Sequence, residues 1–315
     1  MYRKVTCKHS FAVQISLRLR EEARQRNKIV IEEANCSQCP KCQSSKIVKH
    51  GIRHNKKYDL QRFSCKDCKN RFSFNLGFEK LSVNPKIVTS AMQLYFTGES
   101  LRSIQKFLKL QGVNVAHSTV YKWIKKYTDL MKTHLDKITP QVGDTWRADE
   151  VYTKIKGDKK YLFALMDDET RFWISQEVAD SKFKHDARNL LRMAKNSMEM
   201  KPRVFITDGL QAYRDAFKKE YGAVKKGSPI HIRHISLKGD RNNNKMERLN
   251  GEFRDREKVM RGVKKKDSVI FDGYQIYHNY IRSHMGLKGK TPAEACGIEV
   301  KGKDKWITLI QNAKK

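Results

Sequence analysis

The fold is decided by two strand-forming stretches, Trp146-Arg-Ala-Asp-Glu-Val-Tyr-Thr-Lys-Ile155 and Val204-Phe-Ile-Thr-Asp-Gly209. Each carries an aspartate: Asp149 lies within the first, and Asp208 follows the buried apolar run of the second. A third acid, Glu247, begins a strongly helical segment. We expect these carboxylates to project into one polar pocket. Because like charges repel and hard cations take oxygen ligands, the pocket is predicted to bind two Mg²⁺ or Mn²⁺ ions.

The surrounding periodicity predicts a mixed sheet. Strands expected at 146–155, 161–166 and 172–178 form a meander, and acidic residues at 158 and 167–169 are interpreted as turn residues. A helix, a strand, a second helix and a last strand are expected at about 185–200, 203–207, 210–221 and 230–235. This order describes a ribonuclease-H-like α/β core. Glu150 is expected to face away from Asp149, because neighbouring side chains on a pleated strand alternate.

The chain of 315 residues is strongly basic. It contains 66 Lys and Arg against 34 Asp and Glu, a formal net charge of +32. This excess favours a polyanionic partner, and nucleic acid is the leading interpretation over a generally basic surface or a membrane-surface protein. Neither a long apolar span nor a basic amphipathic anchor is present, so no membrane partner is expected. The polar N-terminus does not resemble a secretory signal, and cysteines at metal-ligand spacing indicate a reducing cytoplasm.

Changes in pattern along the chain predict an α+β multidomain protein. In the first region, apolar residues alternate over Phe11, Val13, Ile15, Leu17 and Leu19, which predicts a strand before a possible helix in the charged stretch 21–34. The expected divisions are a basic arm, a zinc ribbon, a helix-turn-helix domain, and a ribonuclease-H-like domain with a C-terminal helical extension, at 1–34, 35–78, 79–138 and 139–315.

Two CxxC pairs, Cys39-Pro-Lys-Cys42 and Cys65-Lys-Asp-Cys68, predict a structural zinc site. Their separation allows four thiolates to surround one tetrahedral Zn²⁺, and the intervening strand-forming residues favour a zinc ribbon over a redox dithiol. Cys36 forms another CxxC with Cys39 and remains an alternative ligand. Unliganded buried cysteines are the other interpretation.

The segment 81–127 is parsed as three helices, at about 85–96, 101–110 and 118–126, with Ser100 and Ser118 as N-caps. The pattern is typical of a helix-turn-helix; an ordinary helical bundle with a basic face is the alternative. In the third helix Val120, Ile124 and Tyr127 form an inward face. The outward residues predicted to contact DNA are Tyr121, Lys122, Lys125 and Lys126.

The helix that carries Glu247 is expected to begin at an N-cap, Asn243 or Asn244, and to pack on the sheet through a stripe of apolar residues that includes Met246. Basic residues along it are predicted to hold DNA phosphates near the metals: Arg248, Arg254, Arg256, Lys258, Arg261 and the run 264–266. Alternatively, Glu247 forms a surface ion pair with Arg254 or Lys245, and Asp208 only shapes the turn before Gly209.

These motifs together resemble the DDE-type insertion-sequence transposases of bacteria and archaea, whose catalytic core is related to that of retroviral integrases. The resemblance covers nearly the whole chain and rests on the order of its motifs. They are Cys39-Pro-Lys-Cys42, Cys65-Lys-Asp-Cys68-Lys-Asn-Arg-Phe72, Asp149-Glu-Val-Tyr152, Ile206-Thr-Asp-Gly209, Asn244-Lys-Met-Glu-Arg248, Tyr277-His-Asn-Tyr-Ile-Arg-Ser-His284 and Lys290-Thr-Pro-Ala-Glu294. The interval between Asp208 and Glu247 is slightly longer than is usual in the family.

The resemblance implies that Asp149, Asp208 and Glu247 are the catalytic metal ligands, with Asp149 bridging both ions. It also implies binding to the terminal inverted repeats of an insertion sequence and to target DNA, cleavage and strand transfer at one site, and a homodimer or larger synaptic assembly in a prokaryotic cytoplasm, associated with the nucleoid. Two alternatives remain, a catalytically silent DNA-binding regulator and a structure-specific nuclease.

Overall fold

The structure is a computed structural model. It describes residues 8–34, 36–54, 59–79, 81–222, 229–233, 243–260, 263 and 268–314.

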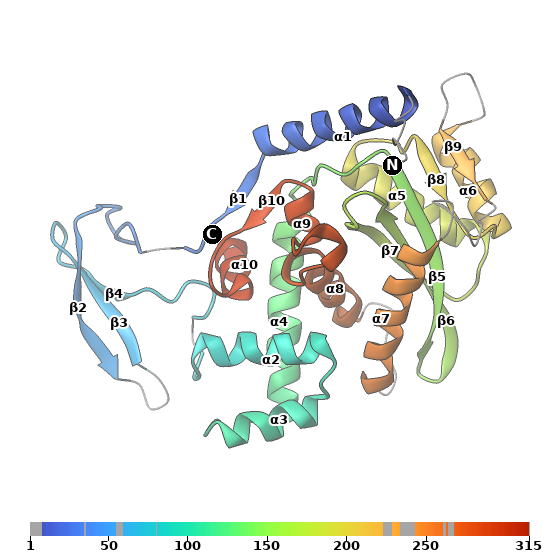
Figure 1. Cartoon of the computed structure of the whole chain (residues 1–315). Helices are drawn as coiled ribbons and strands as arrows, with labels where there is room; N and C mark the ends of the chain where they lie inside the picture. Colours follow the sequence, from blue (N-terminus) through green and yellow to red (C-terminus); the bar gives the residue numbers. More distant parts are fainter. Residues whose placement is uncertain are drawn as a thin grey trace, which may run out of the picture.

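A five-stranded sheet forms the centre of the larger part of the molecule (Figure 1). Its strands lie in the order β7-β6-β5-β8-β9; β5, β6 and β7 are antiparallel, whereas β5, β8 and β9 run parallel. This is the ribonuclease-H-like arrangement expected from the sequence, so the predicted fold class is confirmed. The bounds are Thr145–Ile155 for β5, Asp158–Asp167 for β6, Trp173–Ala179 for β7, Val204–Ile206 for β8 and Ile230–Ile232 for β9.

Short connections set the register of this sheet. The β5–β6 turn has φ of 54° at Lys156 and 92° at Gly157, the two positive values that a tight hairpin between twisted strands requires. Helix α5 (Lys184–Met198) packs on β6 and β7 and against α6 (Gln211–Tyr221), while α7 (Asn244–Met260) runs along β5. The sheet therefore places the middle of β5 between the end of β8 and the first turns of α7.

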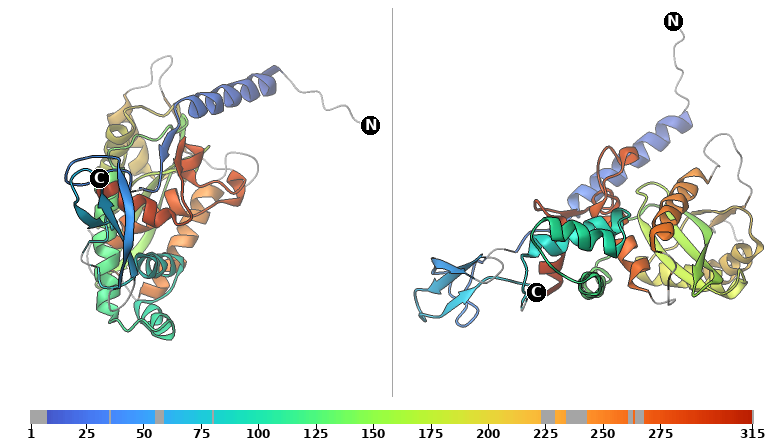
Figure 2. Two further views of the ribbon diagram at one scale, coloured as in Figure 1. Left: turned by 90° about the vertical axis from the view of Figure 1, so that its left-hand side faces the viewer. Right: turned by 90° about the horizontal axis from the view of Figure 1, so that it is seen from below.

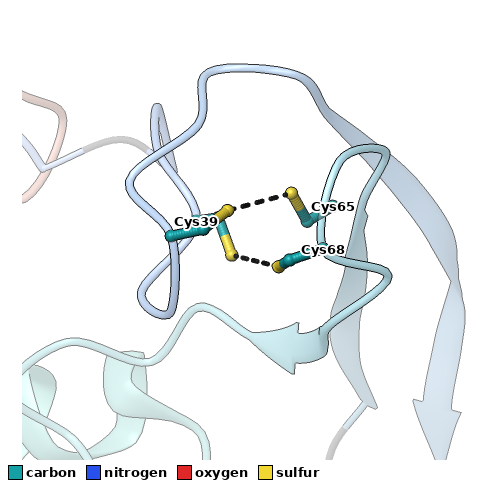
Figure 3. A group of neighbouring side chains, drawn as sticks. Cys39, Cys65 and Cys68 are labelled. Carbon is teal, nitrogen blue, oxygen red and sulfur yellow. Dashed lines mark hydrogen bonds between the residues drawn. The ribbon is translucent and has the colours of Figure 1, made fainter.

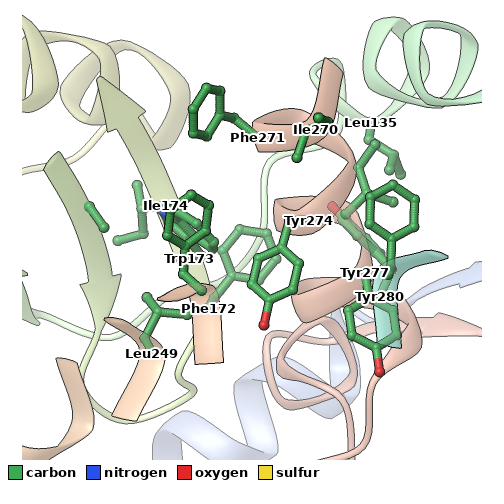
Figure 4. Packing of buried hydrophobic residues seen from close by; sticks show 14 of the residues in the cluster. Leu135, Phe172, Trp173, Ile174, Leu249, Ile270, Phe271, Tyr274, Tyr277 and Tyr280 are labelled. Carbon is green, nitrogen blue, oxygen red and sulfur yellow. The ribbon is translucent and has the colours of Figure 1, made fainter. Parts of the chain in front are cut away.

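A second group of helices shares one continuous hydrophobic core with the sheet. It comprises α2 (Pro85–Thr97), α3 (Leu101–Leu110), α4 (His117–Leu135), α8 (Val269–Ile276) and α10 (Lys305–Lys314). Phe96 of α2 stacks on Trp306 at 5.6 Å between ring centroids. A Cβ at Gly273 of α8 would lie 2.3 Å from the Phe96 ring, so only glycine permits this approach. Figure 4 shows Trp173 of the sheet facing Tyr274 of α8 within this core.

The core thus crosses the predicted boundary between 79–138 and 139–315. Helix α4 contacts α8 and α10 as well as α2 and α3, and it extends to Leu135, beyond the predicted end near 126. Ser100 caps α3 as predicted, accepting a hydrogen bond from the Ser103 N–H at 3.0 Å. The predicted cap at Ser118 is wrong: α4 begins at His117, and its N-cap is Ala116, whose side chain makes no capping hydrogen bond.

The N-terminal arm differs from the sequence expectation. Residues Lys8–Arg26 form a helix, α1, where a strand was predicted for 11–19, and the chain leaves it through β1 (Ile29–Ile31). Val13, Ile15, Leu17 and Leu19 remain between 43% and 58% exposed, so their alternation marks no buried strand face. Without a neighbouring strand, a helix satisfies its backbone hydrogen bonds internally.

The arm is nevertheless joined to the rest of the chain. Strand β1 pairs in parallel with β10 (Ile298–Val300), and Arg20 binds Asp144 at 2.8 Å. In one view of Figure 2, α1 extends away from the body of the molecule. Among the residues that the structure describes, no helix combines the length and apolar character needed to cross a membrane.

The zinc-ribbon segment is a separate small sheet that projects to one side (Figure 1). Its antiparallel strands β2 (Ile47–His54), β3 (Asp59–Cys65) and β4 (Arg71–Ser73) lie in that order. The remaining described elements are short: a π-helical turn η1 at Tyr277–Ile281, a 3₁₀ turn η2 at Met285–Leu287, and α9 at Pro292–Ala295.

Candidate active site

The register of two parallel strands brings Asp149 and Asp208 together. Arg147 of β5 lies opposite Ile206 of β8, and both aspartates lie two residues further along. Residues two apart point to the same face, and neighbouring strands are about 4.8 Å apart, so both side chains lie on one face of the sheet. The Asp208 carboxylate also accepts a hydrogen bond from the Leu210 N–H at 3.2 Å, so this residue shapes the turn into α6 as well.

Glu150 belongs to the same acidic cluster, contrary to the expectation that it faces away from Asp149. Carboxylate oxygens of Asp149, Glu150 and Asp208 all lie within 4.8 Å of one another. Pairing between β5 and β8 ends at Arg147, so β8 does not cover the edge of β5 at Asp149 and Glu150. There the Glu150 N–H donates to Asp149 Oδ1 at 2.9 Å, which turns the Asp149 carboxylate along its own strand. Alternation alone does not reveal this turn.

The Glu150 side chain is 3% exposed and pairs with Lys182 Nζ at 2.5 Å. Its second oxygen, Oε2, is buried without a hydrogen-bond partner among the described residues. Burial raises the pKa of Glu150, and the bond from Lys182 opposes that rise. A buried carboxylate oxygen beside two more carboxylates is a potential metal ligand.

Glu247 reaches this region on α7, which is attached to the sheet at several points. Asn250 Nδ2 donates to Asp149 Oδ2 at 2.9 Å. Glu257 accepts hydrogen bonds from the Thr153 hydroxyl and the Lys154 N–H of β5. Near the first turn, Lys245 Nζ binds Asp168 at 2.7 Å. The backbone carbonyl of Asn243 accepts from the N–H groups of Met246 and Glu247, which agrees with an N-cap at Asn243.

Glu247 itself is exposed and lies outside the group of carboxylates within 4.8 Å. Its charge nevertheless acts on Asp149. The alternative of an ion pair with Lys245 or Arg254 is not what the structure shows: Lys245 binds Asp168, and the Arg254 guanidinium lies 5.8 Å from the centre of the Tyr152 ring. Glu247 is therefore near enough to influence the Asp149 carboxylate but stands further out than the three clustered acids.

Electrostatics at the cluster favour a cation. Burial, followed by repulsion from Glu150, Asp208 and Glu247, raises the pKa of Asp149 to about 7. A carboxylate that holds a proton near neutral pH only because of burial and like charge will release it when a divalent ion supplies the opposite charge. The donors are all carboxylate oxygens, which Mg²⁺ and Mn²⁺ prefer, so the residues fit these ions.

The basic residues predicted to hold DNA lie in different environments. Arg248 and Arg254 are exposed on α7, and Lys258, further along, forms an exposed ion pair with Asp255 at 3.0 Å. Arg261 and the run 264–266 lie outside the described residues. Arg256 is not a surface contact, because it is 3% exposed and its guanidinium lies 4.0 Å from the centre of the Tyr95 ring in α2.

The face predicted on α4 is present. Val120, Ile124 and Tyr127 are fully buried. The residues predicted to face outward are all exposed: Tyr121, Lys122, Lys125 and Lys126. The first half of α4 therefore presents cations and an aromatic ring to solvent, while its second half is packed in the core.

The four predicted cysteines converge in the ribbon. Figure 3 shows Cys39 facing Cys65 and Cys68 across the site. Their sulfur atoms lie within 4.8 Å of one another, with 3.5 Å from Cys39 to Cys68 and from Cys42 to Cys65. Sulfur atoms bonded at about 2.3 Å to a tetrahedral Zn²⁺ would be about 3.8 Å apart, so the cluster fits that ion. Cys36 lies outside the group. Burial opposes the charged form of Cys39, but backbone N–H groups of Cys42 and Lys41 lower its pKa to about 6.

Comparisons with known proteins identify relatives of this chain. A family model described as a DDE domain matches residues 143–284. The transposase for insertion sequence-like element IS431mec of Staphylococcus aureus (strain N315) is 30% identical over 158 residues, which cover 49% of this chain and 68% of that protein. The same figures hold for the Staphylococcus aureus transposase for insertion sequence element IS257 in transposon Tn4003.

Among solved structures, the catalytic core domain of HTLV-2 integrase in complex with magnesium, in its trimeric form, is similar to part of this chain. The matched region covers 50% of this chain and 98% of that domain. The sequence identity is 18% and the TM-score is 0.36.

Proposed function

Since the chain belongs to the family of DDE-type insertion-sequence transposases, we propose that it binds the terminal inverted repeats of an insertion sequence, cleaves the DNA at those ends and joins them to target DNA. The observation that carries the proposal is the meeting of Asp149 and Asp208 at the edge of β5 that β8 does not cover, with Glu247 on the adjoining helix. Nothing else in the described structure gathers carboxylates in this way.

In this proposal Asp149, Asp208 and Glu247 hold the divalent ions, and Glu150 supports Asp149 or adds a ligand. Two Mg²⁺ or Mn²⁺ ions bound there would activate the attacking water or 3′-hydroxyl and stabilise the departing oxygen. Asn250 orients Asp149 through its hydrogen bond, and the α7 anchors on β5 fix the distance of Glu247. Arg248 and Arg254 would hold the phosphates that flank the reacting one.

The two N-terminal modules would supply end recognition. The exposed face of α4, with Tyr121, Lys122, Lys125 and Lys126, suits a DNA groove, and the net charge of +32 suits the backbone. Zn²⁺ held by Cys39, Cys42, Cys65 and Cys68 would stabilise the ribbon. The domains at 1–34, 35–78, 79–138 and 139–315 are part of the proposal, as is a homodimer or larger assembly that pairs two ends in the cytoplasm, at the nucleoid.

A joining assay tests the proposal. Pre-cleaved end DNA, taken from either side of the gene, is incubated with a target plasmid in Mg²⁺ or Mn²⁺. Joined molecules that depend on the metal are expected from the wild type and absent from Asp149→Ala, Asp208→Ala and Glu247→Ala, with end binding largely retained. Asp215→Ala, an exposed acid of α6, is the matched control and should join normally.

The same assay separates the alternatives. A DNA-binding regulator would bind ends without cutting or joining, and a structure-specific nuclease would cut without joining. Retained joining in any of the three acid variants would refute the assignment of that residue.

A further inference from the structure

A cleft of about 240 Å³ lies beside α7, and none of the three clustered acids lines it. Nine residues line it: Met166, Arg171, Asn244, Lys245, Arg248, Leu249, Glu252, His278 and His284. At roughly 30 Å³ for each water molecule, its volume holds about eight waters, more than enough for a phosphate group with part of its sugar.

The charges around the cleft are mainly positive. Arg171, Lys245 and Arg248 contribute three cations, and the single carboxylate, Glu252, is already paired with Arg282. Lys245 is bound by Asp168. The side chains of Arg171 and Arg248 make no hydrogen bond or ion pair with any described residue. Two guanidinium groups beside one cleft without acidic partners favour an anionic ligand.

Two buried imidazoles add groups that lack partners. His278 is 3% exposed and His284 is 8% exposed, and their rings meet edge to face with centroids 4.7 Å apart. His278 Nε2 bonds to the Arg171 carbonyl at 3.0 Å, but His278 Nδ1 and His284 Nε2 are buried without a partner in the described chain. Such atoms call for an explanation, and a bound ligand or ordered water is one.

Local backbone geometry also indicates that this cleft is specialised. Arg171 has a φ of 58°, in the left-handed region that glycine or asparagine adopts more readily, so the turn itself gives no reason for an arginine. A Cβ at Gly286 would lie 2.1 Å from an Arg171 guanidinium nitrogen, so the absence of a side chain there leaves room for the guanidinium. His278 is held in the π-helical turn η1, a rare geometry that is frequent at functional sites.

The cleft lies close to the acidic cluster. Glu247 and Arg248 are consecutive on α7, so their side chains leave the helix about 100° apart. Asp149 pairs with Ala164 on β6, and Met166 of the cleft lies two residues beyond Ala164. One strand spacing and two residues along a strand place the Cα atoms of Asp149 and Met166 roughly 8 Å apart. One or two nucleotides of a DNA strand span that distance.

We propose that this cleft binds a backbone phosphate of the DNA strand whose neighbouring phosphodiester lies at the acidic cluster, with Arg171 and Arg248 as its direct contacts. The inference rests on the proposed function and adds to it a phosphate subsite built from the turn after β6, α7 and the segment 278–284. Burial lowers the pKa of His278 and of His284, and repulsion from Arg282 and Arg171 lowers both further. The cleft therefore has a positive potential, which a bound phosphate would neutralise.

A substitution cycle between protein and DNA tests it. Binding of end DNA is measured by fluorescence anisotropy, with one uncharged methylphosphonate placed in turn at each position near the cleavage point. We expect Arg171→Gln to weaken binding ~10-fold and to reduce the salt slope of log K by about 1, as for the loss of one phosphate contact. At one position, the methylphosphonate should lower the affinity of the wild type for end DNA by the same factor. It should not lower the affinity of the Arg171→Gln variant any further.

Two control variants show whether a loss of binding comes from the position of the Arg171 guanidinium or only from the change in net charge. Gly286→Ala keeps every charge but displaces the Arg171 guanidinium, and it should weaken binding at the same position. Arg192→Gln removes one charge from α5, outside the cleft, and should leave the position dependence unchanged. Additive losses at every position, or identical behaviour of Arg192→Gln and Arg171→Gln, would overturn the proposal.

Free phosphate is the other source of the same chemistry. If inorganic phosphate raises the melting temperature of the wild type but not of Arg171→Gln, and no methylphosphonate position is coupled to Arg171, the cleft binds free phosphate and the DNA assignment fails. The joining assay keeps the two proposals apart. If the protein joins DNA in a metal-dependent way but no methylphosphonate position is coupled to Arg171, only the phosphate subsite is rejected. If the protein binds ends without joining them, the proposed function is rejected, and the coupling between Arg171 and a methylphosphonate position still tests the cleft.

Discussion

The cysteine cluster and the acidic cluster both gather anionic ligands, but they are assembled in different ways. Cys39 and Cys42 lie in one knuckle, Cys65 and Cys68 in another, and the β2–β3 hairpin joins the two. The carboxylates come from the middle of β5, the end of β8 and the first turn of α7. The first site is fixed by local backbone, whereas Asp149, Glu150 and Asp208 meet only when β5 and β8 are in register, and Glu247 lies further out on α7.

The protonation of the two clusters differs accordingly. Backbone N–H groups overcome the effect of burial and lower the pKa of Cys39 to about 6. At Asp149 burial and neighbouring carboxylates act together and raise the pKa to about 7. The ribbon therefore stabilises the charge of Cys39 through its own backbone before any ion binds. At Cys42 the Ser44 backbone acts in the same direction, but hydrogen bonds among the thiols raise the pKa to about 12, so an ion is needed to hold all four ligands as thiolates.

The largest expected effect is on the ribbon. Cys39→Ser with Cys65→Ser removes a ligand from each knuckle and should abolish zinc binding, because structural zinc contributes ~10 kcal/mol or more to folding such modules. Metal analysis should fall from about one zinc per chain to none, and limited proteolysis should cut within 36–79. Mn²⁺ binding at the acidic cluster, followed by electron paramagnetic resonance, should be unchanged.

Cys36→Ser is the matched control, since Cys36 lies outside the four-sulfur group. Loss of zinc in that variant would show that Cys36 is a ligand, and loss of Mn²⁺ binding in the double variant would contradict the independence of the two sites.

The next effect is a pH dependence confined to the acidic cluster. Because the Asp149 pKa is raised, a proton competes with the metal below about pH 7, and Mn²⁺ affinity should rise up to ~10-fold per pH unit before levelling off. In the metal-free folded protein Asp149 keeps a proton that it releases in the unfolded chain between about pH 4 and 7, so its own contribution to stability should fall as the pH rises through that window. The buried histidines His231 and His278, whose pKa values are lowered, contribute in the opposite direction. Thermal melts with and without Mn²⁺ measure this.

Glu150→Gln sharpens the same test. It removes the carboxylate whose repulsion raises the pKa of Asp149 more than that of any other neighbour. The Asp149 pKa should therefore fall, and the rise in Mn²⁺ affinity should level off at a lower pH. Asp215→Asn, an exposed acid outside the cluster, should leave the profile unchanged. An identical profile in Glu150→Gln would mean that the charge of Glu150 does not contribute to the raised pKa of Asp149.

The two sites also differ in how far the sequence predicts them. CxxC spacing identified all four cysteines, because a knuckle is complete within four residues. The sheet order followed from alternating residues and from the turn at Gly157. Asp149 and Asp208 were singled out because one lies within a strand-forming stretch and the other follows a buried apolar run, and the structure brings them together.

What the sequence missed depends on contacts between distant elements. Glu150 joins the cluster because β8 pairing stops at Arg147, which periodicity does not report. Arg256 looked like a surface cation on α7 but is covered by Tyr95 of α2. The apolar residues of α1 alternate as they would in a strand, but no described strand pairs with this segment. Each error arose where a neighbour far away in the sequence decided the outcome.

The smallest expected effect tests whether the acidic cluster depends on attachments outside itself. Glu257 lies toward the far end of α7 from Glu247 and accepts hydrogen bonds from the Thr153 hydroxyl and the Lys154 N–H. Glu257→Ala should lower stability by ~1–2 kcal/mol, since both bonds to a charged acceptor are lost. Joining should fall by a few-fold because Glu247 is held less firmly, while zinc content and end binding remain unchanged.

Asp255→Ala, an exposed change on the same helix, is the control and should alter neither stability nor joining appreciably. The contrast between the two clusters would be wrong if the Glu257→Ala variant is less stable but joins DNA at the wild-type rate. That result would mean that α7 holds Glu247 in place without its distal attachment to β5, so that the acidic cluster, like the cysteine cluster, is determined by its immediate surroundings.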